Sequence, residues 1–260
     1  MTQQPNPNQN DISQIELSTA VASRLTFAPG AGRFAIWSSD GQSVVIGGAG
    51  TALYQKPASG AGQETLVPVP SGFYATFPED WSRDGRWFIY SATAKTAWDI
   101  WALDMTNDTA RPILDAPANE VLARISPDGR WIAYTSDESG TWEVYVQPFP
   151  DGAGKWQVST GGGSHPLWRG DGKELFYLTA DGRLIAVSLG GGPRFEPEPI
   201  QPLFQTRVPP VLAPFRYGYA VSPDGQRFLL NNVVLDAEPS AITIVRHWRT
   251  GLETQRPGRD

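Results

Sequence analysis

The sequence has no cysteine among its 260 residues, so disulfide bonds, thiolate metal sites and a cysteine nucleophile are excluded. It has no run of 18 apolar residues, so no membrane-spanning helix is expected. Histidine is scarce: His165 and His247 are far apart, and no Asp-x-Asp-x-Asp-Gly loop occurs, so neither a metal site nor a cofactor is predicted. Charged residues are also sparse, at 18% with a net charge of −6, which argues against nucleic-acid binding because that function needs a basic face.

Both ends of the chain are polar. Residues 1–14 are rich in Asn, Gln and Pro and lack the basic start and apolar stretch of a signal peptide. We expect a disordered leader over residues 1–22, a single folded domain over 23–250, and a flexible tail over 251–260.

Glycine, proline and aromatic residues are abundant instead, with 27 Gly, 23 Pro, 10 Trp, 8 Tyr and 11 Phe. Hydrophobic residues make up 40% of the chain, which is enough for a sizeable core and argues against disorder. This composition is typical of many short strands joined by tight turns.

An Asp-Gly step recurs at residues 40, 84, 128, 171 and 224, with spacings of 44, 44, 43 and 53. Strand-type sequence rich in Val, Ile, Tyr, Trp and Phe flanks each step. A period in the forties with such flanks indicates a β-propeller. We predict an all-β, five-bladed propeller of four-stranded antiparallel blades.

The repeated Asp-Gly residues are interpreted as structural turns. Glycine accepts a positive φ without steric cost, and aspartate can accept backbone N–H bonds across a turn. A metal or catalytic role is disfavoured because carboxylates spaced one per blade cannot converge on one substrate atom. The turn residues are Asp40, Gly41, Asp84, Gly85, Asp128, Gly129, Asp171, Gly172, Asp224 and Gly225.

The fifth repeat lacks a fourth strand, because the residues after 250 are polar. The segment 23–27 precedes the first repeat and belongs to no other blade, so we expect it to supply that strand and close the ring. The alternative is that the chain is part of a larger propeller.

Two further predictions come from aligning the repeats. Trp37, Trp81 and Trp168 precede the turns at equivalent positions and are predicted to lie in the core between blades, with carbohydrate stacking as the alternative. One step earlier, Asp80 and Arg124 carry opposite charges on adjacent blades. We predict that they form an ion pair near the central channel.

Residues that flank the first strands of the blades combine charge with aromatic surface, which suits recognition. We predict that a protein or peptide partner, or a small polar ligand, docks at the channel mouth. The candidate residues are Arg33, Phe77, Glu79, Asp80, Glu120, Arg124, His165, Arg216 and Tyr217.

Two enzyme classes are alternatives to binding. Glu79, Asp80 and Glu120 lie at or before first strands and could serve as the acid and base of a five-bladed glycosidase. The run Gly162-Gly163-Ser164-His165-Pro166 approaches the hydrolase motif Gly-x-Ser-x-Gly, but Pro replaces its last Gly and no helical segment follows.

The stretch Ser-Pro-Asp-Gly-Arg-Trp-Ile-Ala-Tyr (126–134) resembles the repeat of TolB-like propellers, also called PD40 or WD40-like. Three longer pieces, 143–150, 154–163 and 171–177, resemble the propeller that follows the kinase domain in bacterial eukaryote-like serine/threonine kinases. That resemblance implies a non-catalytic, extracytoplasmic sensing or interaction module. The chain itself has no Gly-rich phosphate loop, His-Arg-Asp or Asp-Phe-Gly motif, so no kinase activity is expected.

Overall fold

The computed structural model describes residues 11–26, 34–47, 51–94, 97–190, 192, 194–208, 218–231 and 243–246. These residues contain 21 strands and no helix, which confirms the all-β prediction. The chain divides into two compact units, Met1–Pro117 and Ala118–Asp260, which we describe separately.

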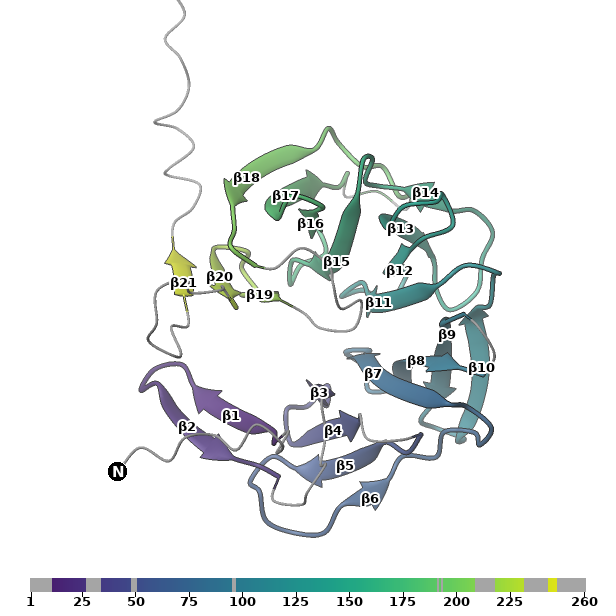
Figure 1. The fold of residues 1–260 in the computed structure, drawn as a ribbon, viewed down its shortest axis with the longest axis vertical. Helices are drawn as coiled ribbons and strands as arrows, with labels where there is room; N and C mark the ends of the chain where they lie inside the picture. Colours follow the sequence, from purple (N-terminus) through teal and green to yellow (C-terminus); the bar gives the residue numbers. More distant parts are fainter. Residues whose placement is uncertain are drawn as a thin grey trace, which may run out of the picture. The chain divides into compact units, whose positions relative to one another are not determined.

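The N-terminal unit contains a hairpin and two four-stranded antiparallel blades (Figure 1). In each blade, strands that are consecutive in the sequence are neighbours in the sheet. The strands are β1 (Ser13–Glu16) and β2 (Val21–Arg24) in the hairpin, β3 (Phe34–Trp37), β4 (Ser43–Gly47), β5 (Tyr54–Pro57) and β6 (Thr65–Leu66) in the first blade, and β7 (Ala75–Trp81), β8 (Trp87–Thr93), β9 (Asp99–Asp104) and β10 (Thr109–Leu114) in the second.

The C-terminal unit contains the remaining three blades (Figure 1). The third blade consists of β11 (Glu120–Ile125), β12 (Trp131–Ser136), β13 (Glu143–Pro148) and β14 (Trp156–Gln157). The fourth consists of β15 (Gly163–Trp168), β16 (Glu174–Thr179), β17 (Arg183–Ser188) and β18 (Gln201–Gln205). The fifth has three strands among the described residues, β19 (Tyr219–Val221), β20 (Arg227–Leu230) and β21 (Thr243–Arg246). The chain therefore has the five blades that the Asp-Gly spacing predicts.

The N-terminal segment differs from the sequence prediction. Part of the expected leader is ordered, because β1 pairs with β2 in antiparallel register, Ser13 opposite Arg24. The strand that was expected to complete the last blade therefore has β1 as its partner. The base of this hairpin is held by an Arg24–Asp11 ion pair at 2.5 Å and by the Leu25 N–H, which donates to the Ile12 carbonyl at 2.8 Å. The predicted tail, 251–260, lies outside the described residues.

Apolar side chains fill the space between consecutive blades within each unit. Val45 and Leu53 of the first blade pack with Phe88 and Tyr90 of the second. In the C-terminal unit, equivalent clusters join the third blade to the fourth and the fourth to the fifth. Burial of these side chains drives blade stacking, since each large apolar side chain contributes about 1.5–3 kcal/mol when it is removed from water.

Four of the five Asp-Gly turns share one hydrogen-bond pattern, whereas in the fourth blade Arg169 stands in the serine position and its guanidinium donates to Asp171 at 2.6 and 2.7 Å. In the third blade, the Ser126 hydroxyl donates to Asp128 at 2.6 Å and accepts from the Trp131 N–H at 2.9 Å, while Asp128 accepts from the Arg130 N–H at 3.1 Å. Gly129 has a φ of 74°, which favours glycine. In these four turns the serine two residues before the aspartate is thus as much part of the turn as the Asp-Gly step itself.

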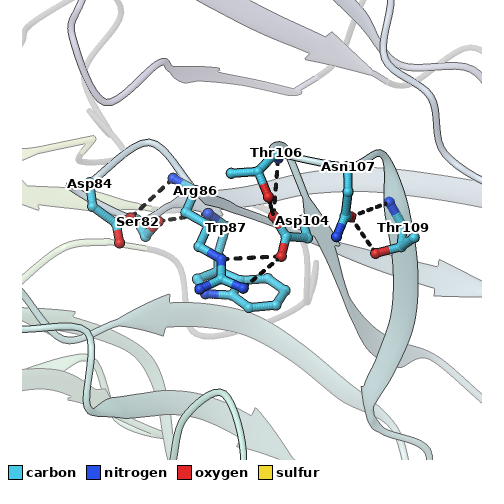
Figure 2. A network of polar contacts seen from close by, with 8 residues as sticks. All are labelled: Ser82, Asp84, Arg86, Trp87, Asp104, Thr106, Asn107 and Thr109. Atoms are coloured by element: carbon cyan, nitrogen blue, oxygen red, sulfur yellow. Dashed lines mark hydrogen bonds and ion pairs between the residues drawn. The ribbon is translucent and has the colours of Figure 1, made fainter.

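The second blade adds a charged network beyond its turn (Figure 2). The Arg86 guanidinium donates to Asp104 Oδ2 at 2.9 and 3.1 Å and lies 4.8 Å from the centre of the Trp87 ring. Asp104 Oδ1 accepts from the Thr106 N–H and hydroxyl, at 3.0 and 2.6 Å. These bonds lower the pKa of Asp104 to about 2, with the Arg86 hydrogen bond as the largest cause.

The tryptophans before the turns do not share one environment. Trp168 is 8% exposed and packs among side chains of the third and fourth blades, as predicted. Trp37 is 52% exposed, so the prediction of a core position is wrong for this residue. The reason is the alternation of side chains along β3: Ile36 packs on the second blade, and Trp37 points to the opposite face.

Candidate functional site

Phe77 is the centre of an aromatic stack in the N-terminal unit. Its ring centre lies 4.9 Å from that of Trp98, with the planes at 22°, and 4.4 Å from that of Phe34, with the planes at 55°. Phe77 lies near the start of β7, Trp98 immediately precedes β9, and Phe34 opens β3. All three side chains are half-buried, so part of the aromatic surface remains open to a ligand.

A fourth aromatic residue lies at the same end of the second blade. The Tyr74 N–H donates to the carbonyl of Thr93, the last residue of β8, at 2.7 Å. The Tyr74 side chain is 72% exposed, the highest value among the exposed large hydrophobic residues described. We refer to Phe34, Tyr74, Phe77 and Trp98 together as the aromatic end.

Two predicted carboxylates lie next to a β-bulge in β7. Pro78 pairs with Tyr90 and Asp80 with Ile89, so Glu79 is the extra residue. Glu79 is 3% exposed and accepts a hydrogen bond from the hydroxyl of Ser91, which is itself fully buried. Asp80 is half-buried. The bulge therefore turns one carboxylate into the blade and leaves the next one partly accessible.

Two acidic residues at this end of the blade were not among the predicted site residues. Burial raises the pKa of Asp99, and the charge of Asp115 raises it further. Their counterparts 44 residues later are Glu143 and Ser159. There the Ser159 hydroxyl and the Gly162 N–H, the latter at 2.8 Å, both donate to Glu143. The second blade thus has a pair of like charges where the third blade has a hydrogen-bonded pair.

Glu120 is buried in the C-terminal unit. It opens β11 opposite Ser136, and Ser136 lies opposite Glu143 on the next strand, so the three side chains form a row across one face of the sheet. Glu120 is 1% exposed and Glu143 is 2% exposed. Neither carboxylate presents its oxygen atoms to solvent, so Glu120 does not have the accessibility expected of a funnel carboxylate.

His165, Arg124 and Tyr219 come together from three strands of the C-terminal unit. The Tyr219 hydroxyl donates to the His165 carbonyl at 2.8 Å, and the Trp168 indole donates to the Arg124 carbonyl at 2.9 Å. Burial raises the pKa of Tyr219 well above its usual value, and the charge of Arg124 partly opposes that rise. Tyr219 was missed from the sequence because its role depends on a contact with another blade.

His165 has unusual backbone geometry. It lies at a register shift in β15 and has a φ of 59°, as does Leu122, with 58°, at the equivalent position of β11. Its Nδ1 atom is 2.8 Å from the Ser164 hydroxyl, and both side chains are buried. In Ser-His-Asp hydrolases, Nε2 contacts the serine and Nδ1 the acid. The Ser164–His165 pair has the other geometry, which weighs against the hydrolase alternative.

Some predictions concern residues that the structure does not describe or residues that belong to different units. Arg33, Arg216, Tyr217 and His247 lie outside the described residues. Asp80 and Arg124 belong to different units, so their ion pair stays a prediction. In the part of the chain that the structure describes, no group of three or more His, Cys, Asp or Glu residues is placed to hold a metal ion. The same residues include no helix long and apolar enough to cross a membrane.

Antiparallel four-stranded blades stacked through apolar clusters define a β-propeller. Among solved structures of similar fold are two TolB proteins. A candidate TolB from Agrobacterium tumefaciens is 16% identical, with a TM-score of 0.69 over 92% of this chain and 85% of that one. TolB from Acinetobacter baumannii is 15% identical, with a TM-score of 0.65 over 86% of this chain, which spans only 54% of that protein.

An enzyme has the same fold. An oligogalacturonate lyase crystallised with manganese is 16% identical, with a TM-score of 0.63 over 93% of this chain and 69% of that one. At these identities the likeness concerns the fold alone. No protein-family model matches the sequence, and no curated protein is similar enough to count as a match.

Proposed function

We propose that this chain is a non-catalytic β-propeller recognition module that binds a ligand at the aromatic end of its second blade. The observation that carries the proposal is the half-buried stack of Phe34, Phe77 and Trp98, with the exposed Tyr74 at the same end of the second blade. Aromatic side chains supply large, rigid contact area and dominate the binding energy of many interfaces. Loops and strand ends on a rigid scaffold are also the usual place for such surfaces.

The burial of two candidate acids favours binding over glycoside hydrolysis. A glycosidase needs two carboxyl groups that reach the sugar, about 5–10 Å apart. Glu79 and Glu120 are 3% and 1% exposed, so neither offers a carboxylate to a substrate in this conformation. Asp80 alone is partly accessible among the three predicted acids. Because an oligogalacturonate lyase has a similar fold, catalysis is the competing hypothesis, and the experiment must test it.

A sensing role in a receptor-like kinase is the biological setting we propose. It rests on the resemblance of residues 143–150, 154–163 and 171–177 to kinase-associated propellers. In that setting the propeller would bind an extracytoplasmic protein, peptide or small polar ligand. The TolB neighbours are compatible with an interaction module and identify no partner.

The test combines binding with turnover on the same protein. The purified chain is screened against peptides and oligosaccharides by tryptophan fluorescence, and each hit is checked for product formation. We expect at least one ligand that binds without turnover and whose affinity falls about tenfold in Trp98→Ala, consistent with the loss of one aromatic anchor. Tyr54→Ala is the control, because Tyr54 is 43% exposed on the first blade and outside the aromatic end. Product formation that is lost in Asp80→Asn would contradict the proposal.

A further inference from the structure

The N-terminal hairpin corresponds to the outer half of a blade. Residues 11–26 align without a gap with residues 99–114, which form β9 and β10 of the second blade. The offset of 88 residues is twice the spacing of 44 that separates the first Asp-Gly steps. Both segments begin with Asp-Ile, and an acidic residue ends the first strand of each, Glu16 in β1 and Asp104 in β9.

The two segments also share the geometry of their turns. Ala20 has a φ of 57° and Asp108, at the equivalent position, has a φ of 56°, although neither is glycine. Glu16 accepts hydrogen bonds from the N–H and the hydroxyl of the residue two positions later, at 3.2 and 2.9 Å. Asp104 does the same, at 3.0 and 2.6 Å. β1 and β2 are therefore built as the third and fourth strands of a blade.

The inner half of this blade is the part that the hairpin lacks. β9 has β8 along its other edge, whereas β1 has no second strand partner among the described residues. In the second blade, Leu103 lies opposite Phe88 of β8 and is fully buried, but its equivalent Ile15 is 42% exposed. Leu17 is 60% exposed, and its equivalent Met105 packs in the core between blades. The exposed apolar side chains thus mark the place where inner strands pack in a complete blade.

Trp37 gives independent evidence for the same open place. Its equivalent Trp168 donates to the carbonyl of Arg124, which lies on the first strand of the preceding blade. Trp37 is opposite Val44, and Val44 packs against Leu25 directly after the hairpin. The hairpin therefore lies on the face of the first blade that holds Trp37. The tryptophan is exposed where the first strand of a preceding blade would cover it.

We infer that β1 and the Trp37 face of the first blade form a docking site for a β-hairpin of the β7–β8 type, provided by a partner polypeptide. Each of the five repeated Asp-Gly turns already joins the first two strands of its own blade, so none of them supplies this hairpin. A strand added to the edge of β1 gains main-chain hydrogen bonds, and its side chains bury Ile15 and Trp37. A two-stranded hairpin alone is marginally stable in water, so an added pair of strands stabilises it. The site involves none of the residues of the aromatic end.

The test uses a synthetic peptide of residues 75–93, which span β7, its Asp-Gly turn and β8. The full-length chain carries benzoylphenylalanine at position 37 or, as a control, at position 74, the exposed tyrosine of the second blade. We expect the peptide to crosslink from position 37 and not from position 74, and a peptide of the same composition in scrambled order to crosslink from neither. Bound peptide should also slow hydrogen exchange of the β1 amides.

Two matched variants test the edge at which the peptide binds. Ile15→Ser should weaken binding about tenfold, because Ile15 would lie opposite an aromatic side chain of the added strand. Val21→Ser should leave the affinity unchanged, since Val21 is 62% exposed on β2, whose equivalent β10 is the outer strand of its blade. Hydrogen exchange of residues 21–24 verifies that the hairpin is intact in both variants. Equal crosslinking of the scrambled peptide, no crosslink from position 37, or equal weakening by the two variants would overturn the inference.

Discussion

The indole nitrogen of Trp168 donates a hydrogen bond to the backbone carbonyl of Arg124 at 2.9 Å, and this bond joins β15 of the fourth blade to β11 of the third. The same position of the first blade is held by Trp37, which is 52% exposed. One repeat position therefore has a blade-joining role in one part of the chain and a solvent-exposed ring in another.

This pair of tryptophans gives a matched test of stability. Trp168→Phe removes the donor and part of the ring, so we expect a loss of about 1–3 kcal/mol in the free energy of unfolding. Trp37→Phe should change it by less than about 0.5 kcal/mol, because the site is a surface position. Urea unfolding followed by circular dichroism measures both. Equal losses in the two variants would contradict the difference in packing.

The Asp99–Asp115 pair predicts an unusual pH dependence. Because the pKa of Asp99 is raised in the folded state, its protonated form stabilises the fold at low pH. That contribution is complete below the unfolded pKa, near 3.8, and is lost as pH rises through the higher folded value. At neutral pH the two carboxylates repel each other.

Removal of that repulsion should stabilise the protein. Asp115→Ser, which copies the residue of the third blade, is expected to raise the free energy of unfolding at pH 7 by about 0.5–1 kcal/mol, a value limited by the solvent exposure of the pair. Asp115→Asn should act in the same direction, and Asp115→Glu, which keeps the charge, should not. Thermal unfolding at pH 7 and pH 3 provides the comparison, and a gain of the same size at both values would argue against a charge effect.

The stability that the Arg86–Asp104 ion pair contributes depends on pH in the opposite direction. Since its hydrogen bonds lower the pKa of Asp104 to about 2, the stabilisation is present above the unfolded pKa of 3.8 and is lost as pH falls toward 2. Asp104→Asn should therefore be less stable than the wild type at neutral pH, and the difference should narrow between pH 4 and pH 2. Arg86→Gln should show the same narrowing. A difference between wild type and variant that stays constant over this range would show that the network of Figure 2 contributes no pH-dependent stability.

The fold could be predicted because its turns depend on a few adjacent residues. Features that depend on contacts between distant segments could not be predicted. Asp128-Gly129 and its counterparts mark each blade because a positive φ and an Asx-type turn are properties of a few adjacent residues. The exposure of Trp37 depends on which face of β3 packs on the next blade, and the hairpin partner of Val21–Arg24 depends on a segment with no strong strand pattern.

In the candidate site too, some residues could be predicted from the repeat, and others depend on contacts that only the structure reveals. Phe77 and Asp80 could be chosen from the sequence because the repeat places them on a first strand. Glu79 could be chosen too, but its burial depends on a bulge that only the paired strands reveal. Trp98 and Tyr74 were missed because they lie in connecting segments, and their relation to Phe77 is a matter of tertiary packing. The 44-residue offset from Asp99 to Glu143 was the one signal in the sequence that could have identified the acidic pair.

The most direct test of the central claim is site-specific photo-crosslinking of a bound ligand. A benzoylphenylalanine is introduced at position 74, at the aromatic end, or at position 54, on the first blade, both of which are exposed tyrosines in the same unit. We predict that a ligand obtained from the screen crosslinks from position 74, that an excess of unlabelled ligand prevents the crosslink, and that Trp98→Ala removes it. A crosslink from position 54 and none from position 74 would contradict binding at the aromatic end.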